Sequence, residues 1–388
     1  MNLEQLFEKY KCEQLYGRYI TNTHIEPSLN QLKPFFEIDI AGYSVLEKPI
    51  YSIKAGTGKN RILIWSQMHG NESTTTKAIF DMLNFLKSDE EIAYKIKSEF
   101  TFYILPIVNP DGAANYTREN ANKTDLNRDA ANLSEPESKV LRESFNSFKP
   151  HYCYNMHDQR TIFGLLSDND RPKPATVSFL APAYNVERSV NSCRQKAINL
   201  IVAMNTTLQN YIPGQVGRFD DSYNQNCVGD SFQSLGVPTI LFEAGHYDND
   251  YEREETRKFI FYSLIDGFTA IYENVIVVSK NDEYFNIPQN KAVFYDFLYK
   301  NANINYESKE KIAIFASQYK EVLIDNSVTF SAIIKEINNE ELYYGHKEYD
   351  LKGGVFSGND GSSKPEEGMP ADFTVAPGRQ FINGTEVI

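Results

Sequence analysis

Three candidate metal ligands near the ends of two apolar runs constrain the fold of this chain more than any other feature. His69 and Glu72 come shortly after the run 62–65, and His157 follows a second run, 152–156. Short apolar runs bounded by polar residues are typical of buried strands. The pattern therefore predicts strands whose ends carry the three side chains, which is where open α/β sheets place their ligands.

These residue types are typical of a catalytic zinc site. A structural zinc is usually closed by four protein ligands, often cysteines. A catalytic zinc has three, for which two histidines and a glutamate are an established set, and keeps one position open for water. Such water is a nucleophile near neutral pH, so the three residues predict one zinc ion per chain and a hydrolytic reaction. Taken singly, His157 has another interpretation, a hydrogen-bonded core histidine.

Further polar motifs follow other predicted strands along the chain. They are Asn109-Pro110-Asp111-Gly112 after the run 102–108, Arg118, Asp125-Leu126-Asn127-Arg128, and Glu243 after the run 238–242. With these motifs, in this order, the chain resembles the zinc carboxypeptidase family of carboxypeptidase A-like metallopeptidases. The resemblance covers roughly residues 40–275.

The resemblance implies a role for each residue near the reacting bond. His69, Glu72 and His157 would hold the zinc ion. Glu243 would be the general base that takes a proton from the attacking water and passes it to the leaving amine. Arg118 would stabilise the oxyanion that forms at the carbonyl group, an interaction usually worth about 3 kcal/mol. Taken singly, Glu243 has the alternative of a polar residue that merely ends a strand.

The resemblance also implies residues that bind the substrate. Asn127 and Arg128 would hold its terminal carboxylate, for which a planar guanidinium suits paired hydrogen bonds. Tyr223 lies near the position of a family tyrosine close to the reacting carbonyl, but Tyr247 or a purely structural tyrosine are alternatives in a chain with 25 tyrosines. Asp230 would favour a basic terminal group, and its alternative is a loop aspartate bonded to nearby backbone.

The composition of the chain limits the classes of partner that it is expected to bind. The net charge of −13 disfavours nucleic acid and anionic membrane surfaces, and no apolar run reaches the length of a membrane span. The first ten residues lack the features of a signal peptide. The four cysteines, at positions 12, 153, 193 and 227, are scattered, which suits reduced thiols. We expect a cytoplasmic protein without nucleic-acid or membrane partners, and its oligomeric state stays open.

The order of predicted elements indicates an α/β fold. Residues 1–278 are expected to form a zinc carboxypeptidase-like catalytic domain, a mixed central sheet flanked by helices. Residues 279–388 carry none of the motifs and are expected to form a small C-terminal accessory domain, α+β or β-rich, which shapes substrate access or oligomer contacts or simply stabilises the chain. Predicted helices span 2–15, 73–86, 187–208, 254–272 and 310–319, and predicted strands span 43–54, 61–67, 101–108, 151–157, 238–243 and 328–334.

Three functions are compatible with these residues. The first is a zinc-dependent hydrolase that removes a C-terminal residue from a peptide, or a related amidase that cleaves γ-D-glutamyl bonds of peptidoglycan. The second is a deacylase of small N-acyl amino acids, because aspartoacylase and succinylglutamate desuccinylase resemble this chain at H-G-N-E and D-L-N-R. The third is a catalytically inactive binding module, which would be expected to lose at least one of the motifs. The substrate would accordingly be a peptide, a muropeptide or an N-acyl amino acid.

Overall fold

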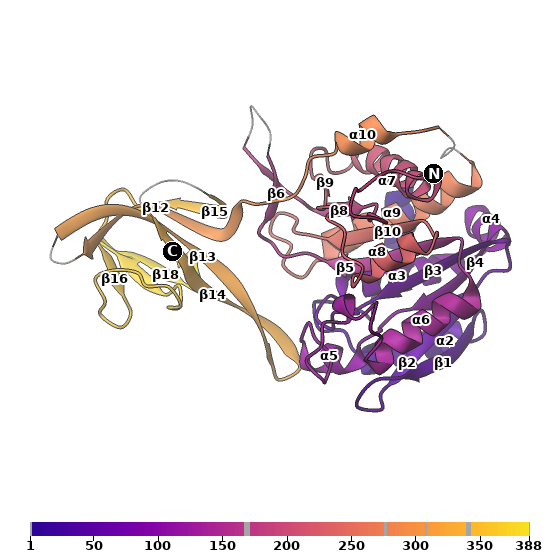
Figure 1. Cartoon of the computed structure of the whole chain (residues 1–388). Coiled ribbons are helices and arrows are strands. Elements are labelled where there is room, and N and C mark those ends of the chain that lie inside the picture. The colour runs from indigo at the N-terminus through magenta and orange to yellow at the C-terminus, as the bar shows by residue number, and fades with distance from the viewer. Residues whose placement is uncertain (1, 167–170, 275–277, 307–308, 339–342, 388) are drawn as a thin grey trace. The chain divides into compact units, whose positions relative to one another are not determined.

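The computed structural model shows two compact units (Figure 1). It describes residues 2–166, 171–274, 278–306, 309–338 and 343–387. Unit 1 comprises residues 1–159 and 175–290, and unit 2 comprises residues 160–174 and 291–388. The division after residue 290 lies later in the chain than the boundary after residue 278 that the sequence suggests. Residues 160–174 also belong to unit 2, whereas the sequence places them in the first domain.

Unit 1 is built on an eight-stranded mixed sheet with the strand order β1-β2-β4-β3-β5-β10-β8-β9. The central strands β4, β3, β5 and β10 run parallel, and antiparallel pairings extend the sheet on both sides. The strands are β1 (Glu37–Tyr43), β2 (Pro49–Ala55), β3 (Asn60–Ser66), β4 (Phe100–Leu105), β5 (Tyr152–Asp158), β8 (Val177–Leu180), β9 (Val216–Arg218) and β10 (Thr239–Ala244).

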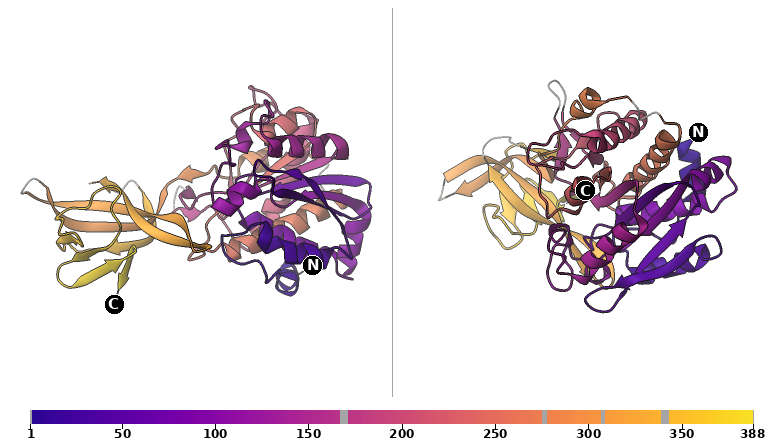
Figure 2. Two further views of the ribbon diagram at one scale, coloured as in Figure 1. Left: turned by 90° about the horizontal axis from the view of Figure 1, so that it is seen from below. Right: turned by 45° about the vertical axis from the view of Figure 1, so that its right-hand side comes forward.

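Helices cover both faces of this sheet because its central strands are apolar on both faces (Figure 2). Along β3, Ile62 and Ile64 belong to the core beneath α3, α7 and α9, whereas Leu63 and Trp65 belong to the core beneath α6 and α8. The predicted α/β fold is confirmed. The helices are α1 (Leu3–Tyr10), α2 (Asn22–Leu32), α3 (Thr74–Leu86), α4 (Glu91–Glu99), α5 (Pro110–Asn115), the 3-10 helix η1 (Leu126–Arg128), α6 (Pro136–Phe148), α7 (Ser192–Leu208), α8 (Val228–Ser234), α9 (Glu254–Tyr272) and α10 (Asn281–Phe285).

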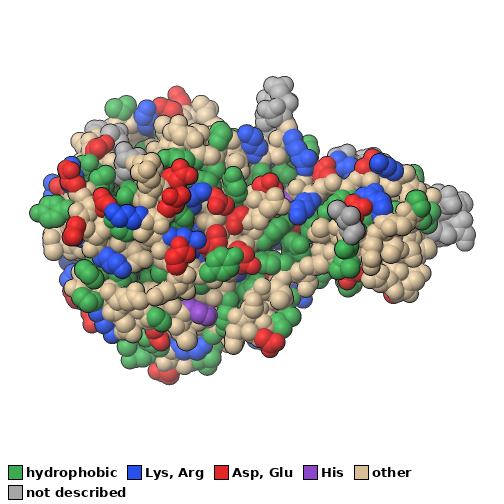
Figure 3. Space-filling view, turned by 180° about the vertical axis from the view of Figure 1, so that it is seen from behind, with side chains coloured by type: hydrophobic (Ala, Val, Ile, Leu, Met, Phe, Trp, Pro, Cys, Tyr) green, Lys and Arg blue, Asp and Glu red, His purple; other side chains and the backbone are tan. Residues whose placement is uncertain are grey.

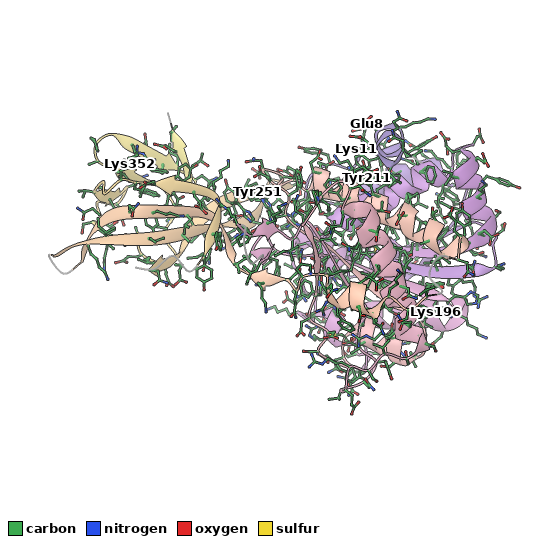
Figure 4. The ribbon with its side chains drawn as sticks, turned by 90° about the horizontal axis from the view of Figure 1, so that it is seen from above. Glu8, Lys11, Lys196, Tyr211, Tyr251 and Lys352 are labelled. Carbon is green, nitrogen blue, oxygen red and sulfur yellow. The ribbon has the colours of Figure 1, made fainter. Side chains whose placement is uncertain are left out.

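Two predicted helices are shorter in the structure, because side chains redirect the backbone at their ends. Helix α1 stops at Tyr10, and the next free amide, that of Cys12, donates a 2.6 Å hydrogen bond to the Asp81 carboxylate. Lys11, labelled in Figure 4, lies 3.1 Å from the Glu254 carboxylate. Helix α7 begins late, where the Asn191 side chain accepts a hydrogen bond from the backbone of the first turn.

Unit 2 is β-rich, as predicted. Its sheets have the orders β14-β13-β12-β15, β16-β17-β18-β19 and β11-β6-β7. The last of these explains the assignment of residues 160–174 to unit 2, because β6 and β7 come from the described part of this range and β6 pairs with β11. The strands are β6 (Phe163–Leu165), β7 (Lys173–Pro174), β11 (Lys291–Ala292), β12 (Phe294–Tyr306), β13 (Lys309–Ile324), β14 (Ser327–Asn338), β15 (Tyr344–Asp350), β16 (Phe356–Gly358), β17 (Phe373–Val375), β18 (Arg379–Ile382) and β19 (Thr385–Val387).

The predicted helix at 310–319 is wrong. These residues lie in strand β13, which pairs with β12 on one side and β14 on the other. Ala313 and Phe315 are buried, whereas Ile312 is 52% exposed and Ile314 is half-buried, which is the period of a strand and not of a helix. The predicted strand at 328–334 is confirmed within β14.

The described residues include no helix with both the length and the apolar composition needed to span a bilayer. On the face seen in Figure 3, basic side chains of the described residues are interspersed with acidic ones.

Candidate metal centre

The three predicted zinc ligands meet at the carboxyl ends of the neighbouring strands β3 and β5. His69 and Glu72 lie in the turn between β3 and α3, and His157 lies near the end of β5. Their ligand atoms all lie within 4.8 Å of one another. Nδ1 of His157 is 2.7 Å from Oε2 of Glu72 and 3.1 Å from Nδ1 of His69, which is itself 2.8 Å from Oε1 of Glu72.

This arrangement fits a zinc ion. Two imidazole nitrogens and a carboxylate turned toward one another are a known ligand set of zinc. Burial lowers the pKa of His157, which favours the neutral imidazole that binds metals. Burial acts to raise the pKa of Glu72, but its interactions with His69 and His157, including hydrogen bonds to both, outweigh burial and hold that pKa well below its ordinary value. The carboxylate is therefore in its ionised, metal-binding form.

Asp125 supports the ligand set, although sequence reasoning assigned it no role. Its Oδ1 lies 2.9 Å from Nε2 of His69, and its Oδ2 accepts hydrogen bonds from Nε and Nη2 of Arg118 at 3.1 and 3.0 Å. A carboxylate on the outer nitrogen of a metal-binding histidine fixes the tautomer and the ring orientation. The signal was present in the sequence, because Asp125 opens the segment from which only Asn127 and Arg128 were assigned.

Arg118 lies at the edge of the ligand set. Its Nη1 donates to Oε1 of Glu72 at 3.3 Å, while Asp125 holds the other side of the guanidinium. The side chain is 42% exposed, so part of the cation faces solvent beside the ligands. This position suits the predicted contact with a developing oxyanion.

Glu243 stands beside His157 on the adjacent strand. β10 runs parallel to β5, and in this register Glu243 is the partner of His157, so both side chains lie on the same face of the sheet. Burial raises the pKa of Glu243 well above its ordinary value, and the charges of Glu72 and Asp158 add to this effect. The structure thus brings a carboxyl group that favours protonation next to the candidate zinc ligands.

Comparison with known proteins gives a family match over part of unit 1. The family model described as zinc carboxypeptidase matches residues 23–156. This part of the chain is therefore similar to the zinc carboxypeptidase family. The match includes His69, Glu72 and Asp125 and stops just before His157, so the placement of His157 and Glu243 rests on the structure.

The curated proteins that are similar to this chain include carboxypeptidases. Carboxypeptidase 2 of Trichophyton tonsurans is 29% identical over 120 residues, which cover 30% of this chain and 21% of that protein. Carboxypeptidase 2 of Trichophyton rubrum is 30% identical over 100 residues, 25% of this chain and 19% of that protein. The aligned region thus spans about a fifth of the length of these curated relatives.

Solved carboxypeptidase structures share the fold. A metallo-carboxypeptidase from Burkholderia cenocepacia matches with a TM-score of 0.53 and 15% identity, over 66% of this chain and 70% of that one. Carboxypeptidase A from Helicoverpa armigera matches with a TM-score of 0.52 and 16% identity, over 71% and 80%. At these identities the likeness concerns the fold alone.

Within unit 1, Asn127 and Arg128 lie in the short helix η1 and face α8. Oδ1 of Asn127 accepts a 3.0 Å hydrogen bond from the backbone amide of Val228, the first residue of α8. Nη1 of the exposed Arg128 donates to the carbonyl of Asn127 at 2.7 Å and to Sγ of Cys227 at 3.0 Å. The exposed guanidinium suits a carboxylate from solution, whereas Asn127 orders the loop.

The loop between α5 and α6, which carries these residues, is held by buried polar groups. Nδ2 of Asn120 donates to Glu135 at 2.7 Å, and its Oδ1 accepts from the backbone amides of Asn122 and Thr124. The carboxylate of Asp129 accepts from the amide of Glu135. These hydrogen bonds satisfy backbone groups that have no partner within a helix or a sheet. They hold the long irregular segment in place, so the side chains that it carries have fixed positions.

The structure gives less support to the roles predicted for Asp230 and Tyr223. Asp230 is buried in α8, and its Oδ2 accepts a 3.0 Å hydrogen bond from the amide of Asn224, which matches the alternative of a backbone-bonded aspartate. Tyr223 is half-buried in the preceding loop, and among the described residues no hydrogen bond joins its hydroxyl to the ligands or to Glu243. Tyr247 packs against Phe259 in the core. The roles predicted for Asp230 and Tyr223 stay predictions.

Proposed function

We propose that this protein is a zinc-dependent hydrolase that cleaves a C-terminal peptide or peptide-like amide bond. The observation that carries the proposal is the convergence of His69, Glu72 and His157 within 4.8 Å, with Glu243 paired to His157 on the next strand. When bound, zinc acts as a Lewis acid that makes water a nucleophile at neutral pH. Side chains of the protein carry out the proton transfers and stabilise the charges that develop on the substrate.

Glu243 acts as the general base in this proposal. It lies at the end of β10, beside the ligands, and burial first and then the charges of Glu72 and Asp158 raise its pKa. A carboxylate with a raised pKa is a stronger base than an exposed one, so it removes a proton from the attacking water and then returns it to the leaving amine. General acid–base transfer of this kind contributes about 10²–10⁴-fold to a rate.

The arginines neutralise the two anionic groups of the reacting substrate. Asp125 binds one side of the Arg118 guanidinium, and Nη1, which donates to Glu72 at the edge of the ligand set, is the nitrogen nearest to the oxygen that gains charge during attack. Arg128 is exposed and binds the terminal carboxylate, because a guanidinium fork matches two carboxylate oxygens. Recognition of a free carboxylate makes the proposed enzyme an exopeptidase.

The test is a cleavage screen read by mass spectrometry with the zinc-loaded full chain. The panel mixes free-acid peptides, their C-terminal amides, muropeptides and N-acyl amino acids. We expect the wild type to release C-terminal residues from free-acid substrates. Cleavage confined to muropeptides or to N-acyl amino acids would instead identify the amidase or the deacylase.

The matched control is Glu243→Gln, which keeps the shape of the side chain and removes the base. We expect it to bind zinc as the wild type does and to lose about 10²-fold or more in kcat. A Glu243→Gln protein that retained the wild-type kcat would contradict the assignment of the base. Loss of zinc in the same variant would show that Glu243 supports the metal instead.

A further inference from the structure

Glu72 is connected to strand β5 by a short ring of hydrogen bonds in addition to its contact with His157. The amide of Asp158, the residue after His157, donates to Oε2 of Glu72 at 3.2 Å. Oδ2 of Asp158 in turn accepts from the amide and the hydroxyl of Thr74 at 3.1 and 2.6 Å. Thr74 lies two residues after Glu72, so both the carboxylate and the backbone near Glu72 are tied to Asp158.

Other bonds hold the first turn of α3 from different directions. The hydroxyl of Ser73 donates to the carbonyl of Arg18 at 2.6 Å. The hydroxyls of Thr75 and Thr76 lie 2.7 and 2.9 Å from that of Ser66 at the end of β3. These contacts reach the N-terminal segment and β3, whereas the bond between Thr74 and Asp158 reaches β5, the strand that carries His157.

The buried carboxylate of Asp158 destabilises the fold unless its oxygens are hydrogen-bonded. The residue is 8% exposed, and its Oδ1 has no hydrogen-bond partner among the described residues. A buried polar atom without a partner destabilises the folded state. An apolar side chain would avoid this cost but could not accept the two bonds from Thr74.

We propose that Asp158 is a positioning residue of the metal centre. Through Thr74 it fixes the turn that carries Glu72 at the distance from β5 at which Glu72 and His157 share one cation. This inference rests on the proposed zinc site. A role in capping α3 alone would affect the stability of the fold without a separate effect on zinc affinity, so zinc affinity is the measurement that distinguishes the two.

The experiment measures zinc affinity of the full chain by competition with a chromophoric chelator. In parallel, the free energy of unfolding of the metal-free protein is measured. We expect Asp158→Ala and Thr74→Val to weaken zinc binding by about 10–100-fold, the range for residues that orient metal ligands. Asp158→Asn and Thr74→Ser keep the acceptor and the donor, so both are expected to bind zinc nearly as the wild type does.

Thr269→Val is the matched control, because it removes a threonine hydroxyl that donates to the carbonyl of Ile265 within α9. Thr74→Val with the zinc affinity of this control would overturn the proposal. Loss of affinity in Asp158→Asn equal to that in Asp158→Ala would also overturn it, since charge and not geometry would then be responsible. If Asp158→Ala does not fold, the difference in zinc affinity between Thr74→Val and Thr74→Ser tests the proposal. A wild type that binds no zinc would overturn the proposed function together with this inference.

Discussion

At the scale of single residues, the site depends on side chains that hold other side chains. His69 is oriented from its outer nitrogen by Asp125, which also binds Arg118. One carboxylate therefore links a candidate ligand to the residue proposed to stabilise the oxyanion. Sequence patterns identify ligands by residue type and spacing, but they do not show which carboxylate faces the back of a histidine. For this reason the sequence shows Asp125 as part of a motif, but only the structure shows its contact with His69.

We expect Asp125→Ala to weaken zinc binding by about 10–100-fold, because His69 loses the partner that fixes its tautomer. The effect should exceed that of Asp129→Ala, which removes a carboxylate bonded to backbone and Ser134 in the same loop. Chelator competition on both variants measures the difference. Equal zinc affinities in the two variants would show that the loop, and not the contact with His69, matters.

Asp230 should make stability depend on pH. Burial raises its pKa to about 7, whereas an unfolded aspartate titrates near about 3.9. Between these values the folded protein holds a proton that the unfolded chain has released, so this group lowers the free energy of unfolding as pH rises through that window. Asp230→Asn keeps an acceptor for Asn224 and cannot ionise. It should therefore gain stability relative to the wild type at about pH 8 but not at about pH 4, as measured by urea unfolding. The same stability difference at both pH values would contradict the shifted pKa.

At the scale of elements, the central strands were predictable and parts of the periphery were not. β3, β5 and β10 are buried on both faces, so their sequences are short apolar runs that favour strands. The segment of β13 mixes charged and apolar residues, and its strand conformation depends on pairing with β12 and β14. The early end of α1 likewise depends on Asp81, a residue of α3. In both segments, contacts between residues distant in the chain determine the backbone conformation.

A buried ion pair joins two of these elements. Arg257 of α9 binds Asp81 of α3 through Nε and Nη2 at 2.7 and 2.6 Å, and both side chains are fully buried. We expect Arg257→Leu to cost about 3–5 kcal/mol, because it leaves the carboxylate buried and unpaired. Lys258→Ala on the same helix removes a partly exposed pair with Glu255 and should cost less than about 1 kcal/mol. Denaturant unfolding of both variants tests the contrast, and similar losses would contradict it.

At the scale of the whole molecule, the chain passes between the two units three times, after residues 159, 174 and 290. Gln159 connects the unit-1 ends of these crossings: its Nε2 donates to the carbonyl of Ala175 at 2.6 Å, and its Oε1 accepts from Asn290 at 2.7 Å. It lies two residues after His157. The chain therefore leaves unit 1 for the first time two residues after a candidate zinc ligand. The sequence did not indicate this, because β6 and β7 are short strands, and β6 pairs with β11, which lies far along the chain.

The two units have separate hydrophobic cores, since the aromatic cluster of Phe297, Tyr299 and Phe315 in unit 2 shares no residue with the cores of unit 1. Separate cores favour separate unfolding transitions. A ligand that binds only one folded unit stabilises that unit alone, by about 2.7 kcal/mol when its free concentration is a hundred times Kd. We therefore expect calorimetry to resolve two transitions, of which only the one that belongs to unit 1 moves to lower temperature when a chelator removes zinc. His157→Ala should abolish this shift and leave the second transition in place. Equal movement of both transitions would show instead that the metal centre stabilises the protein as one cooperative body.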